Sequence, residues 1–297
     1  MTTVKRTGRI ALLGRPNVGK STLMNALVGE HLSIVSRHPQ TTRDRILGIL
    51  TTKTSQFLFY DTPGVHKAKS KLGARMNQEV RDALSMSDVI LFLIEAGREL
   101  SRDDEQLLDA IPEETPFIFV VNKIDRVKLK ADLFPLLERL GQTKAVAIIP
   151  VSALRKDGMP RILKELEGRI PKAAFEFDGD TLTDRSLRFV VAEYVREQIL
   201  SATYQEVPHG VAVTCDEWEE KKAITHIKLT IHVDRESHKK IIIGKGGATL
   251  KMIGEKARKR AEEIVGKKVH MDTWVRVTEE WYQTEKGLID MGYEADR

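Results

Sequence analysis

The fold of this chain is decided by a glycine-rich stretch near its beginning, at residues 14–21. The stretch reads Gly14-Arg15-Pro16-Asn17-Val18-Gly19-Lys20-Ser21. An apolar run precedes it at 10–13, and residues 22–28 follow with helical character. A strand, a glycine loop and a helix in this order form an anion site, because backbone N–H groups and the helix dipole point toward the anion. The pattern G-x-x-x-x-G-K-[ST] therefore predicts a phosphate-binding loop.

Lys20 and Ser21 carry the chemistry of this predicted loop. The Lys20 ammonium is expected to reach the β- and γ-phosphates of a nucleotide, and the Ser21 hydroxyl is expected to ligate Mg²⁺. Gly14 and Gly19 permit backbone conformations that a Cβ would disfavour. The residues predicted to bind the nucleotide here are Gly14, Arg15, Pro16, Asn17, Val18, Gly19, Lys20, Ser21 and Thr22.

The composition narrows the class of protein. The chain has 297 residues, 41% of them hydrophobic, and a net charge of +5. This length predicts about two domains, and the mild basic excess suggests a polyanionic partner. The single cysteine, Cys215, excludes an internal disulfide framework and a cysteine zinc site. No apolar run approaches the ~18 residues that a transmembrane helix needs, so a soluble, cytoplasmic chain is expected.

The first half of the chain alternates apolar runs with polar helical stretches. This alternation favours a mostly parallel sheet with helices on both faces. The strand candidates are 9–13, 46–52, 56–60, 89–96, 116–121 and 145–150, with 46–52 expected at an edge. Ligands of such sheets bind beyond the carboxyl ends of the strands, where polar motifs should therefore follow.

Two polar segments are predicted to complete the metal and γ-phosphate site. Asp61, Thr62, Pro63 and Gly64 follow the run 56–60. Asp61 can hold Mg²⁺ through water, and the Gly64 N–H can meet a γ-phosphate. The loop between the first two strands contains Thr41-Thr42-Arg43. A threonine there can close the Mg²⁺ shell when the γ-phosphate is present, so the loop is predicted to act as a switch.

Guanine is the base that the remaining motifs favour. Asn122, Lys123 and Asp125 follow the fifth predicted strand, and Ser152, Ala153 and Leu154 follow the sixth. The Asp125 carboxylate can accept two hydrogens, from guanine N1–H and from the exocyclic amine, and adenine offers no such pair. The Lys123 stem can lie along the base, and a backbone N–H of residues 152–154 can meet the guanine O6.

Together the motifs G-R-P-N-V-G-K-S, Q-T-T-R, D-T-P-G, N-K-I-D and S-A-L resemble the translation-factor-related GTPases of bacteria. This resemblance implies GTP or GDP with Mg²⁺ as cofactors. It implies that Ser21, Thr42 and Asp61 hold the metal, and that Thr42 rather than Thr41 is the switch threonine. The expected catalytic residues are Lys20, Thr42, Gly64 and Asn17.

The position after Gly64 departs from the small signalling GTPases. Those proteins carry a glutamine there to orient the attacking water, whereas this chain has Val65. Slow basal hydrolysis is therefore expected. By resemblance to similar GTPases, Asn17 either holds K⁺ where an arginine finger's charge would lie or only braces the loop.

The second half of the chain predicts a different domain. We expect a GTPase domain at 1–172, a linker at 173–184 and a second domain at 185–297. Helical periodicity resumes at Ser186, and two alternating strands follow, joined by a polar turn at 219–222. A short helix at 237–242, a glycine loop, a helix to about Ile264 and a strand at 269–277 complete the order α-β-β-α-α-β.

The second glycine loop has the G-x-x-G signature of KH domains, a loop that clamps about four nucleotides of single-stranded nucleic acid. Residues 239–268 contain ten Lys or Arg and three Glu, a local charge of +7 that fits a phosphate-tracking groove. The predicted RNA-binding residues are Ile243, Gly244, Lys245, Gly246, Gly247, Lys251, Arg258 and Lys259. Trp218, Trp274 and Trp281 are expected to pack in the core or at its rim rather than to stack on bases.

An α/β P-loop GTPase domain followed by an α+β type II KH domain resembles the Era-type ribosome-assembly GTPases of bacteria. The resemblance implies binding of small-subunit (16S) ribosomal RNA near its 3′ end, a role in small ribosomal subunit maturation, and a monomer. It also implies partial peripheral association with the cytoplasmic face of the inner membrane. Residue chemistry alone reaches a GTP-switched binder of single-stranded nucleic acid, with a nucleotide-dependent scaffold of little turnover as the alternative.

Overall fold

The computed structural model describes residues 4–38, 40–64, 70–203, 207 and 210–293. They divide into two compact units. The described residues of the first are 4–33, 42–64 and 75–184, and those of the second are 34–38, 40–41, 70–74, 185–203, 207 and 210–293. The second unit therefore takes two short segments from the first half of the chain, which the sequence did not predict.

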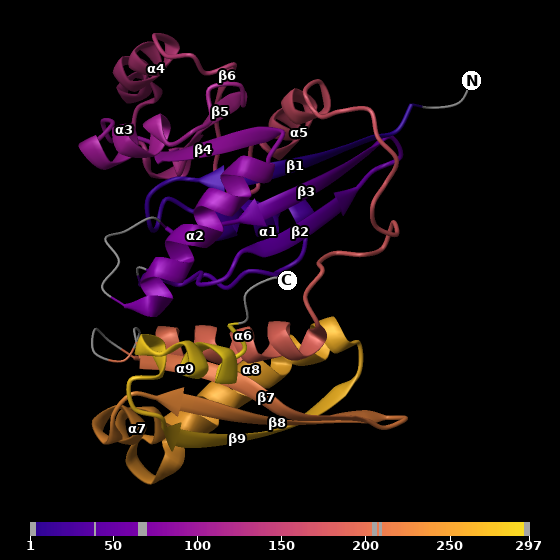
Figure 1. Ribbon diagram of the computed structural model, residues 1–297, viewed down its shortest axis with the longest axis vertical. Helices are drawn as coiled ribbons and strands as arrows, with labels where there is room; N and C mark the ends of the chain where they lie inside the picture. The colour runs from indigo at the N-terminus through magenta and orange to yellow at the C-terminus, as the bar shows by residue number, and fades with distance from the viewer. Residues whose placement is uncertain (1–3, 39, 65–69, 204–206, 208–209, 294–297) are drawn as a thin grey trace. The chain divides into compact units, whose positions relative to one another are not determined.

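The first unit is built on a six-stranded sheet of order β2-β3-β1-β4-β5-β6 (Figure 1). The strands are β1 (Arg6–Leu13), β2 (Ile46–Thr51), β3 (Ser55–Asp61), β4 (Val89–Glu95), β5 (Phe117–Asn122) and β6 (Ala147–Pro150). All neighbours pair in parallel except β2 and β3, which are antiparallel. The predicted edge position of the second strand is confirmed.

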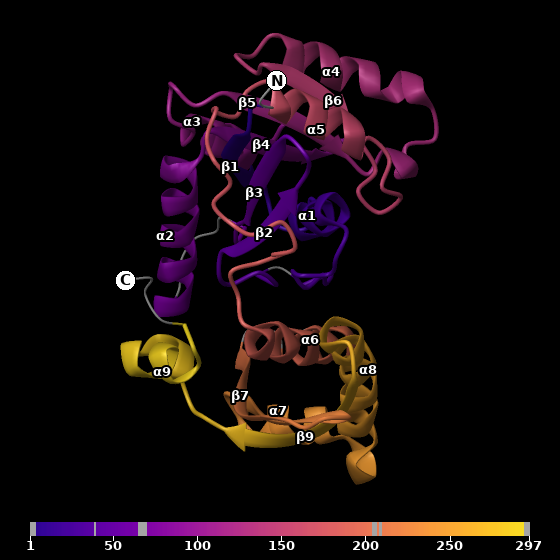
Figure 2. The same cartoon turned by 90° about the vertical axis from the view of Figure 1, so that its right-hand side faces the viewer.

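Helices cover both faces of this sheet. They are α1 (Lys20–Val28), α2 (Lys71–Met86), α3 (Arg102–Asp109), α4 (Phe134–Gly141) and α5 (Met159–Glu167), with 3-10 turns at Ile124–Arg126 and Lys130–Leu133. Leu47 and Ile49 of β2 share a core with α2, whereas Gly48 between them meets Met24 and Val28 of α1. Alternate residues of a strand point to opposite faces, so α1 and α2 lie on opposite sides (Figure 2).

The stretch predicted as a linker, 173–184, contains no helix or strand and lies along the first unit. The Thr7 hydroxyl donates to the carbonyl oxygen of Ala174 (2.8 Å), and Gln56 Nε2 donates to that of Phe177 (2.8 Å). Further along, the Ile49 N–H donates to the carbonyl oxygen of Leu182 (2.8 Å).

The second unit has the predicted α-β-β-α-α-β order. Its elements are α6 (Leu187–Ala202), β7 (Val211–Glu220), β8 (Ile224–Val233), α7 (Glu236–Ile243), α8 (Ala248–Val265) and β9 (Lys268–Val277), followed by a 3-10 turn at Trp281–Gln283 and by α9 (Glu285–Asp290). The sheet order is β7-β8-β9, with β8 and β9 parallel. β7 extends through Glu220, so the turn begins two residues later than predicted.

The core of the second unit lies between this sheet and the helices α6 and α8. It contains Val195 of α6, Leu229 of β8 and Ile253 of α8, each 0% exposed. Within the described residues of the whole chain, no helix is both long and apolar enough to cross a membrane.

Candidate functional site

The phosphate-binding loop joins β1 to α1. Gly14 has φ +147° and Gly19 has φ +102°, backbone angles that favour glycine. Lys20 Nζ donates to the carbonyl oxygens of Gly14 (2.8 Å) and Arg15 (3.2 Å). Burial lowers the pKa of Lys20 to about 8, and the negative charge of Asp61 opposes that shift. Phosphate groups in the loop would favour the charged ammonium.

The Asp61 carboxylate gathers three hydroxyls at the end of β3. Its Oδ2 accepts from Ser21 Oγ (2.6 Å), Ser33 Oγ (2.6 Å) and Thr42 Oγ1 (3.3 Å). The Ser21 and Thr42 hydroxyls lie 3.0 Å apart. The Thr41 hydroxyl bonds to neighbouring residues of its own loop. The geometry therefore places Thr42, and not Thr41, beside the predicted metal ligands.

This group of oxygens fits a magnesium ion. Asp61 is fully buried, and burial raises its pKa, while hydrogen bonds from Ser21 and Ser33 lower it. Its second oxygen, Oδ1, is buried and has no hydrogen-bond partner among the described residues. A hard divalent cation prefers oxygen ligands, and Mg²⁺ keeps several waters. Ser21 and Thr42 would hold it directly, and Asp61 would do so through water.

Asn122 joins the phosphate-binding loop to the loop after β6. Its Nδ2 donates to the carbonyl oxygen of Val18 (2.9 Å), and its Oδ1 accepts from the Ala153 N–H (3.0 Å). A Cβ at Gly19 would collide with this amide. Asn122 is 2% exposed, so it braces the two loops from within.

Lys123 and Asp125 border the place predicted for the base. Lys123 Nζ donates to the carbonyl oxygen of Asn17 (2.7 Å) and pairs with Glu95 (3.0 Å), which stretches the lysine stem across this edge. Asp125 Oδ1 accepts from Ser152 Oγ (2.6 Å). This bond orients the carboxylate that we predict to select guanine.

The backbone N–H groups of residues 152–154 have different partners. That of Ser152 donates to the carbonyl oxygen of Asp157 (3.1 Å), and that of Ala153 donates to Asn122. Among the described residues, the Leu154 N–H has no such partner, and the Leu154 side chain is 75% exposed. The Leu154 N–H is therefore the best placed of the three to meet the guanine O6.

Residues 62–64 continue from Asp61 beside the phosphate-binding loop. The Thr62 hydroxyl donates to a carbonyl oxygen of β1 (2.6 Å). Pro63 links it to Gly64, where a Cβ would lie 2.8 Å from Pro16 Cγ. Glycine thus permits the close approach of the two loops. Val65, on which the prediction of slow hydrolysis rests, lies outside the described residues.

Three of the residues predicted to bind the nucleotide differ in their contacts. The Arg15 guanidinium reaches Ser101 Oγ at the start of α3 (3.1 Å), so its contribution to a nucleotide would come from the backbone. Thr22 lies in the first turn of α1 and is half-buried. Asn17 is exposed and has φ +63°.

The sequence did not predict which residues contact the loop from Ile34 to Thr41. Ile34 is 2% exposed and packs in the core of the second unit. The Val35 N–H donates to Glu197 Oε1 (2.8 Å), and the Arg196 guanidinium donates to the carbonyl oxygen of Thr41 (2.6 Å). More than 150 residues separate these partners, so no local pattern signals them.

The second glycine loop connects α7 to α8. Gly244, Gly246 and Gly247 have φ +71°, +59° and +81°. A Cβ at Gly244 would collide with the Thr249 side chain, whereas a Cβ at Gly246 or Gly247 would meet nothing within 4 Å. Lys245 is exposed. The loop therefore presents an open backbone with one cation at its tip.

The other residues predicted to bind RNA differ in their exposure and in whether they form ion pairs. Ile243 is half-buried at the end of α7. Lys251 and Lys259 are exposed on α8, about 12 Å apart along the helix axis. Arg258 pairs with Glu262 (2.9 Å), one turn further along α8. Lys245, Lys251 and Lys259 are therefore the more available cations.

Two family models match the chain in agreement with these units. Residues 9–123 match the model of a 50S ribosome-binding GTPase, and residues 206–282 match the model of a KH domain. The first match contains the phosphate-binding loop, Asp61 and Asn122, and the second contains the G-x-x-G loop.

Close similarity extends over the whole chain. It is 41% identical to the GTPase Era of Bordetella avium over 97% of this chain and 98% of the relative. It is 43% identical to that of Xanthomonas axonopodis pv. citri over 99% of both.

Solved structures of Era proteins are similar to this chain over nearly its whole length. A crystal structure of Era with MgGDPNP and nucleotides 1506–1542 of 16S ribosomal RNA has a TM-score of 0.94 and 36% identity, covering 98% of this chain and 100% of that one. A single-residue variant of Aquifex aeolicus Era bound to GDP.AlF4- has a TM-score of 0.93, with the same identity and coverage. With the phosphate-binding loop, the Asp61 cluster and the G-x-x-G loop all in place, this chain belongs to the Era family of GTPases.

Proposed function

We propose that this chain is a GTP-gated RNA-binding protein that binds small-subunit ribosomal RNA near its 3′ end and assists small ribosomal subunit maturation. The nucleotide site and the exposed Lys245 next to the open Gly246 support the two binding activities. The solved relative that holds MgGDPNP and 16S ribosomal RNA supports the choice of both ligands. GTP hydrolysis would release the switch loop and weaken the RNA complex.

The proposed gating by GTP rests on one observation, the path of the chain from Ser33 to Thr42. Both residues bond to Asp61 in the first unit. The residues between them belong to the second unit, where Ile34 lies in the core. A metal ion and a γ-phosphate that bind Thr42 would therefore pull on residues 34–41, the adjoining segment, which is anchored in the RNA-binding unit. Such coupling must be reciprocal, so bound RNA should change nucleotide affinity.

Glu197→Ala is expected to weaken this coupling. The change removes the charged acceptor of the Val35 N–H and the partner of Arg260 (3.1 Å). A hydrogen bond to a charged group contributes about 1.5–3 kcal/mol, so the ratio of RNA affinities with GTP analogue and with GDP should fall about tenfold. Fluorescence anisotropy with labelled RNA measures the ratio.

Glu262→Ala is the matched control for that experiment. Glu262 on α8 also accepts from a backbone N–H and from an arginine, at Val269 (3.2 Å) and Arg258 (2.9 Å), but neither partner belongs to the segment 34–41. It should leave the ratio unchanged. An unaltered ratio in Glu197→Ala would show that this anchor does not transmit the nucleotide state.

Hydrolysis is expected to be slow and faster in K⁺ than in Na⁺. Asn17 is exposed within the phosphate-binding loop, where K⁺ could supply the positive charge of an arginine finger. Phosphate release in KCl should exceed that in NaCl by about tenfold, and Asn17→Ala should abolish the difference. Equal rates in the two salts would leave Asn17 as a brace of the loop.

We also infer that the chain is a cytoplasmic monomer, a fraction of which associates with the inner face of the inner membrane. The exposed cations Lys251 and Lys259 of α8 support contact with anionic lipid headgroups. Flotation with vesicles containing phosphatidylglycerol tests this, since the chain should float with them at low salt and stay behind with phosphatidylcholine vesicles.

Crosslinking the chain to RNA in cell extract, with GTP analogue or GDP, tests the proposed function. Sequencing of the bound RNA should enrich the 3′ end of 16S ribosomal RNA, and more strongly with the analogue. Enrichment of large-subunit RNA would move the proposed role to the other subunit. Diffuse RNA, or equal recovery with both nucleotides, would contradict the gated function and favour a scaffold.

A further inference from the structure

One face of the second unit's sheet is turned away from α6 and α8. Leu229 of β8 and Val275 of β9 pack in the core. Because alternate side chains of a strand point to opposite faces, their neighbours Thr230, Trp274 and Arg276 lie on the other side. We call this side the outer face of the sheet.

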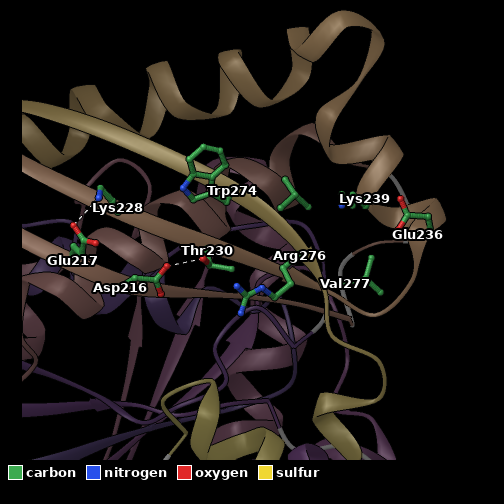
Figure 3. A pocket seen from close by; sticks show the side chains of 10 residues that line it. Asp216, Glu217, Lys228, Thr230, Glu236, Lys239, Trp274, Arg276 and Val277 are labelled. Atoms are coloured by element: carbon green, nitrogen blue, oxygen red, sulfur yellow. Dashed lines mark hydrogen bonds and ion pairs between the residues drawn. The ribbon is translucent and has the colours of Figure 1, made fainter.

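A pocket of about 550 Å³ includes part of this outer face and continues past β9 to Val275 and Val277, which have the core-facing phase of that strand (Figure 3). It reaches from β7 and β8 across β9 to the first half of α7. It is lined by Asp216, Glu217, Lys228, Thr230, Glu236, Lys239, Trp274, Val275, Arg276 and Val277. It is distinct from the G-x-x-G loop, none of whose residues line it.

Trp274 gives the pocket a large exposed aromatic surface. Trp274 is 65% exposed as a residue, whereas Trp281 is 1% exposed in the core. The expectation of core or rim packing is therefore confirmed for Trp281, but Trp274 does not lie in the core. An indole left in water within a pocket offers a flat apolar surface on which a planar group can stack.

The pocket lining contains three acids and three cations, and each acid has a stabilising neighbour of its own. Asp216 accepts hydrogen bonds from Thr214 (2.9 Å) and Thr230 (2.6 Å), and Glu217 pairs with Lys228 (2.8 Å). Glu236 lies in the first turn of α7, where the helix dipole favours a negative charge.

Two lining cations remain available. Within the described part of the chain, neither Lys239 nor Arg276 forms an ion pair with an acidic side chain. Lys239 lies on α7, beyond Trp274 and on the side away from Asp216 and Glu217 (Figure 3). Arg276 lies on β9, beside Thr230 (Figure 3). Each is able to hold a phosphate.

An aromatic surface with unpaired cations is the combination that binds single-stranded nucleic acid, because bases stack on the ring while cations hold the phosphates. Lys239 precedes Gly244 by five residues, about 7.5 Å along α7. We propose that this pocket binds a nucleotide of single-stranded RNA that continues from the G-x-x-G loop, with its base stacked on Trp274 and its phosphates held by Lys239 and Arg276. The inference rests on the proposed RNA-binding function.

The site lengthens the RNA that the second unit can hold. The G-x-x-G loop of a KH domain clamps about four nucleotides, and stacking on Trp274 would add contacts beyond them. Stacking is tolerant of sequence because every base has a π-face, so this pocket adds affinity for longer RNA more than base selection.

The test compares RNAs of two lengths on the full chain with bound GTP analogue. The long RNA is the segment 1506–1542 of 16S ribosomal RNA that the solved Era complex holds. The short one is the tightest-binding tetranucleotide from a set tiled across that segment. Trp274→Ala should weaken binding of the long RNA by about tenfold to hundredfold and leave the tetranucleotide unchanged. Trp274→Phe should restore most of the loss.

His270→Ala is the matched control. His270 lies on the same strand and the same outer face, with a side chain 56% exposed, but it does not line the pocket. The His270→Ala variant should bind both RNAs with the affinity of the parent chain. Thermal unfolding checks that each variant is folded, and quenching of tryptophan fluorescence by the long RNA should be lost with Trp274→Phe.

Arg276→Gln separates stacking from charge. It should lower the slope of log affinity against log salt by about one for the long RNA. Lys267→Gln, which removes a cation paired with Glu220 outside the pocket (3.0 Å), should leave that slope unchanged.

Each outcome decides the proposal. Parent-like affinity of Trp274→Ala for the long RNA would overturn the pocket assignment while leaving RNA binding by the G-x-x-G loop intact. An equal loss for both RNAs would also overturn it, since the pocket would then not act separately. If the parent chain bound neither RNA, the proposed RNA-binding function would fail first, and this inference with it.

Discussion

Asp125→Asn is expected to exchange the guanine preference of the nucleotide site for a xanthine preference. The carboxylate would accept from guanine N1–H and the exocyclic amine, whereas an amide offers one acceptor and one donor. The donor suits the 2-oxo group of xanthine. Each charge-assisted bond contributes about 1.5–3 kcal/mol, so GTP affinity should fall about 10²- to 10³-fold and XTP should bind better than GTP. Competition binding with the two nucleotides measures both changes.

The structure provides a control in the same region. Asp157→Asn makes the same chemical change near the loop after β6, but the Asp157 side chain is 60% exposed and only approaches Arg161 (3.8 Å). Its carbonyl oxygen, which accepts from the Ser152 N–H, is kept. Asp157→Asn should retain the preference for GTP. Unchanged preference in Asp125→Asn would show that another group selects the base.

Replacement of Lys245 and Gly246 by Asp together is expected to abolish RNA binding. Lys245 is the exposed cation of the G-x-x-G loop, and a Cβ at Gly246 meets no other atom within 4 Å. The change therefore places two carboxylates on the surface that phosphates approach. No neighbouring atom blocks the new side chain at Gly246, and Asp is among the residues that best tolerate the left-handed φ of +59° there. Affinity for RNA at low salt should fall by at least about hundredfold, measured by filter binding, while GTP hydrolysis without RNA continues.

A matched charge change elsewhere on the second unit completes the experiment. Lys221→Asp with Ala223→Asp makes the same change in net charge in the exposed turn between β7 and β8. It should reduce RNA affinity only through the weaker long-range field, which salt screens. Equal losses in the two double variants would mean that net charge, and not the G-x-x-G loop, governs binding.

The motifs of the nucleotide site were predictable because each is local and each follows a strand. Asp61 and Asn122 are the last residues of β3 and β5, and Ser152 lies two residues after the end of β6. Parallel strands carry such residues to the same edge of a sheet, so sequence position alone predicted that they meet. The hydroxyl of Ser33 escaped prediction, since 28 residues separate it from Asp61 and nothing in its own segment marks the contact.

The exposure of Trp274 could have been predicted. Val269, Met271 and Val275 mark the core-facing positions of β9, and Trp274 is out of phase with them. Strand alternation therefore sets it on the outer face. Because tryptophan is usually buried, the alternation pattern was overlooked at this position. The pocket around Trp274 also depends on the position of α7, which the alternation of residues along β9 does not predict.

Sequence by itself determined the strands of the first unit, the α-β-β-α-α-β order of the second, the phosphate-binding loop, the carboxylate predicted to select the base and the basic G-x-x-G loop, because these depend on short-range periodicity and on fixed spacing. Tertiary structure decided which hydroxyls share Asp61, that Ile34 lies in the core of the second unit, and that Trp274 opens into a pocket. Those contacts join residues far apart in the chain. Burial and hydrogen-bond pairing of the whole fold select them, and no local stretch contains that information.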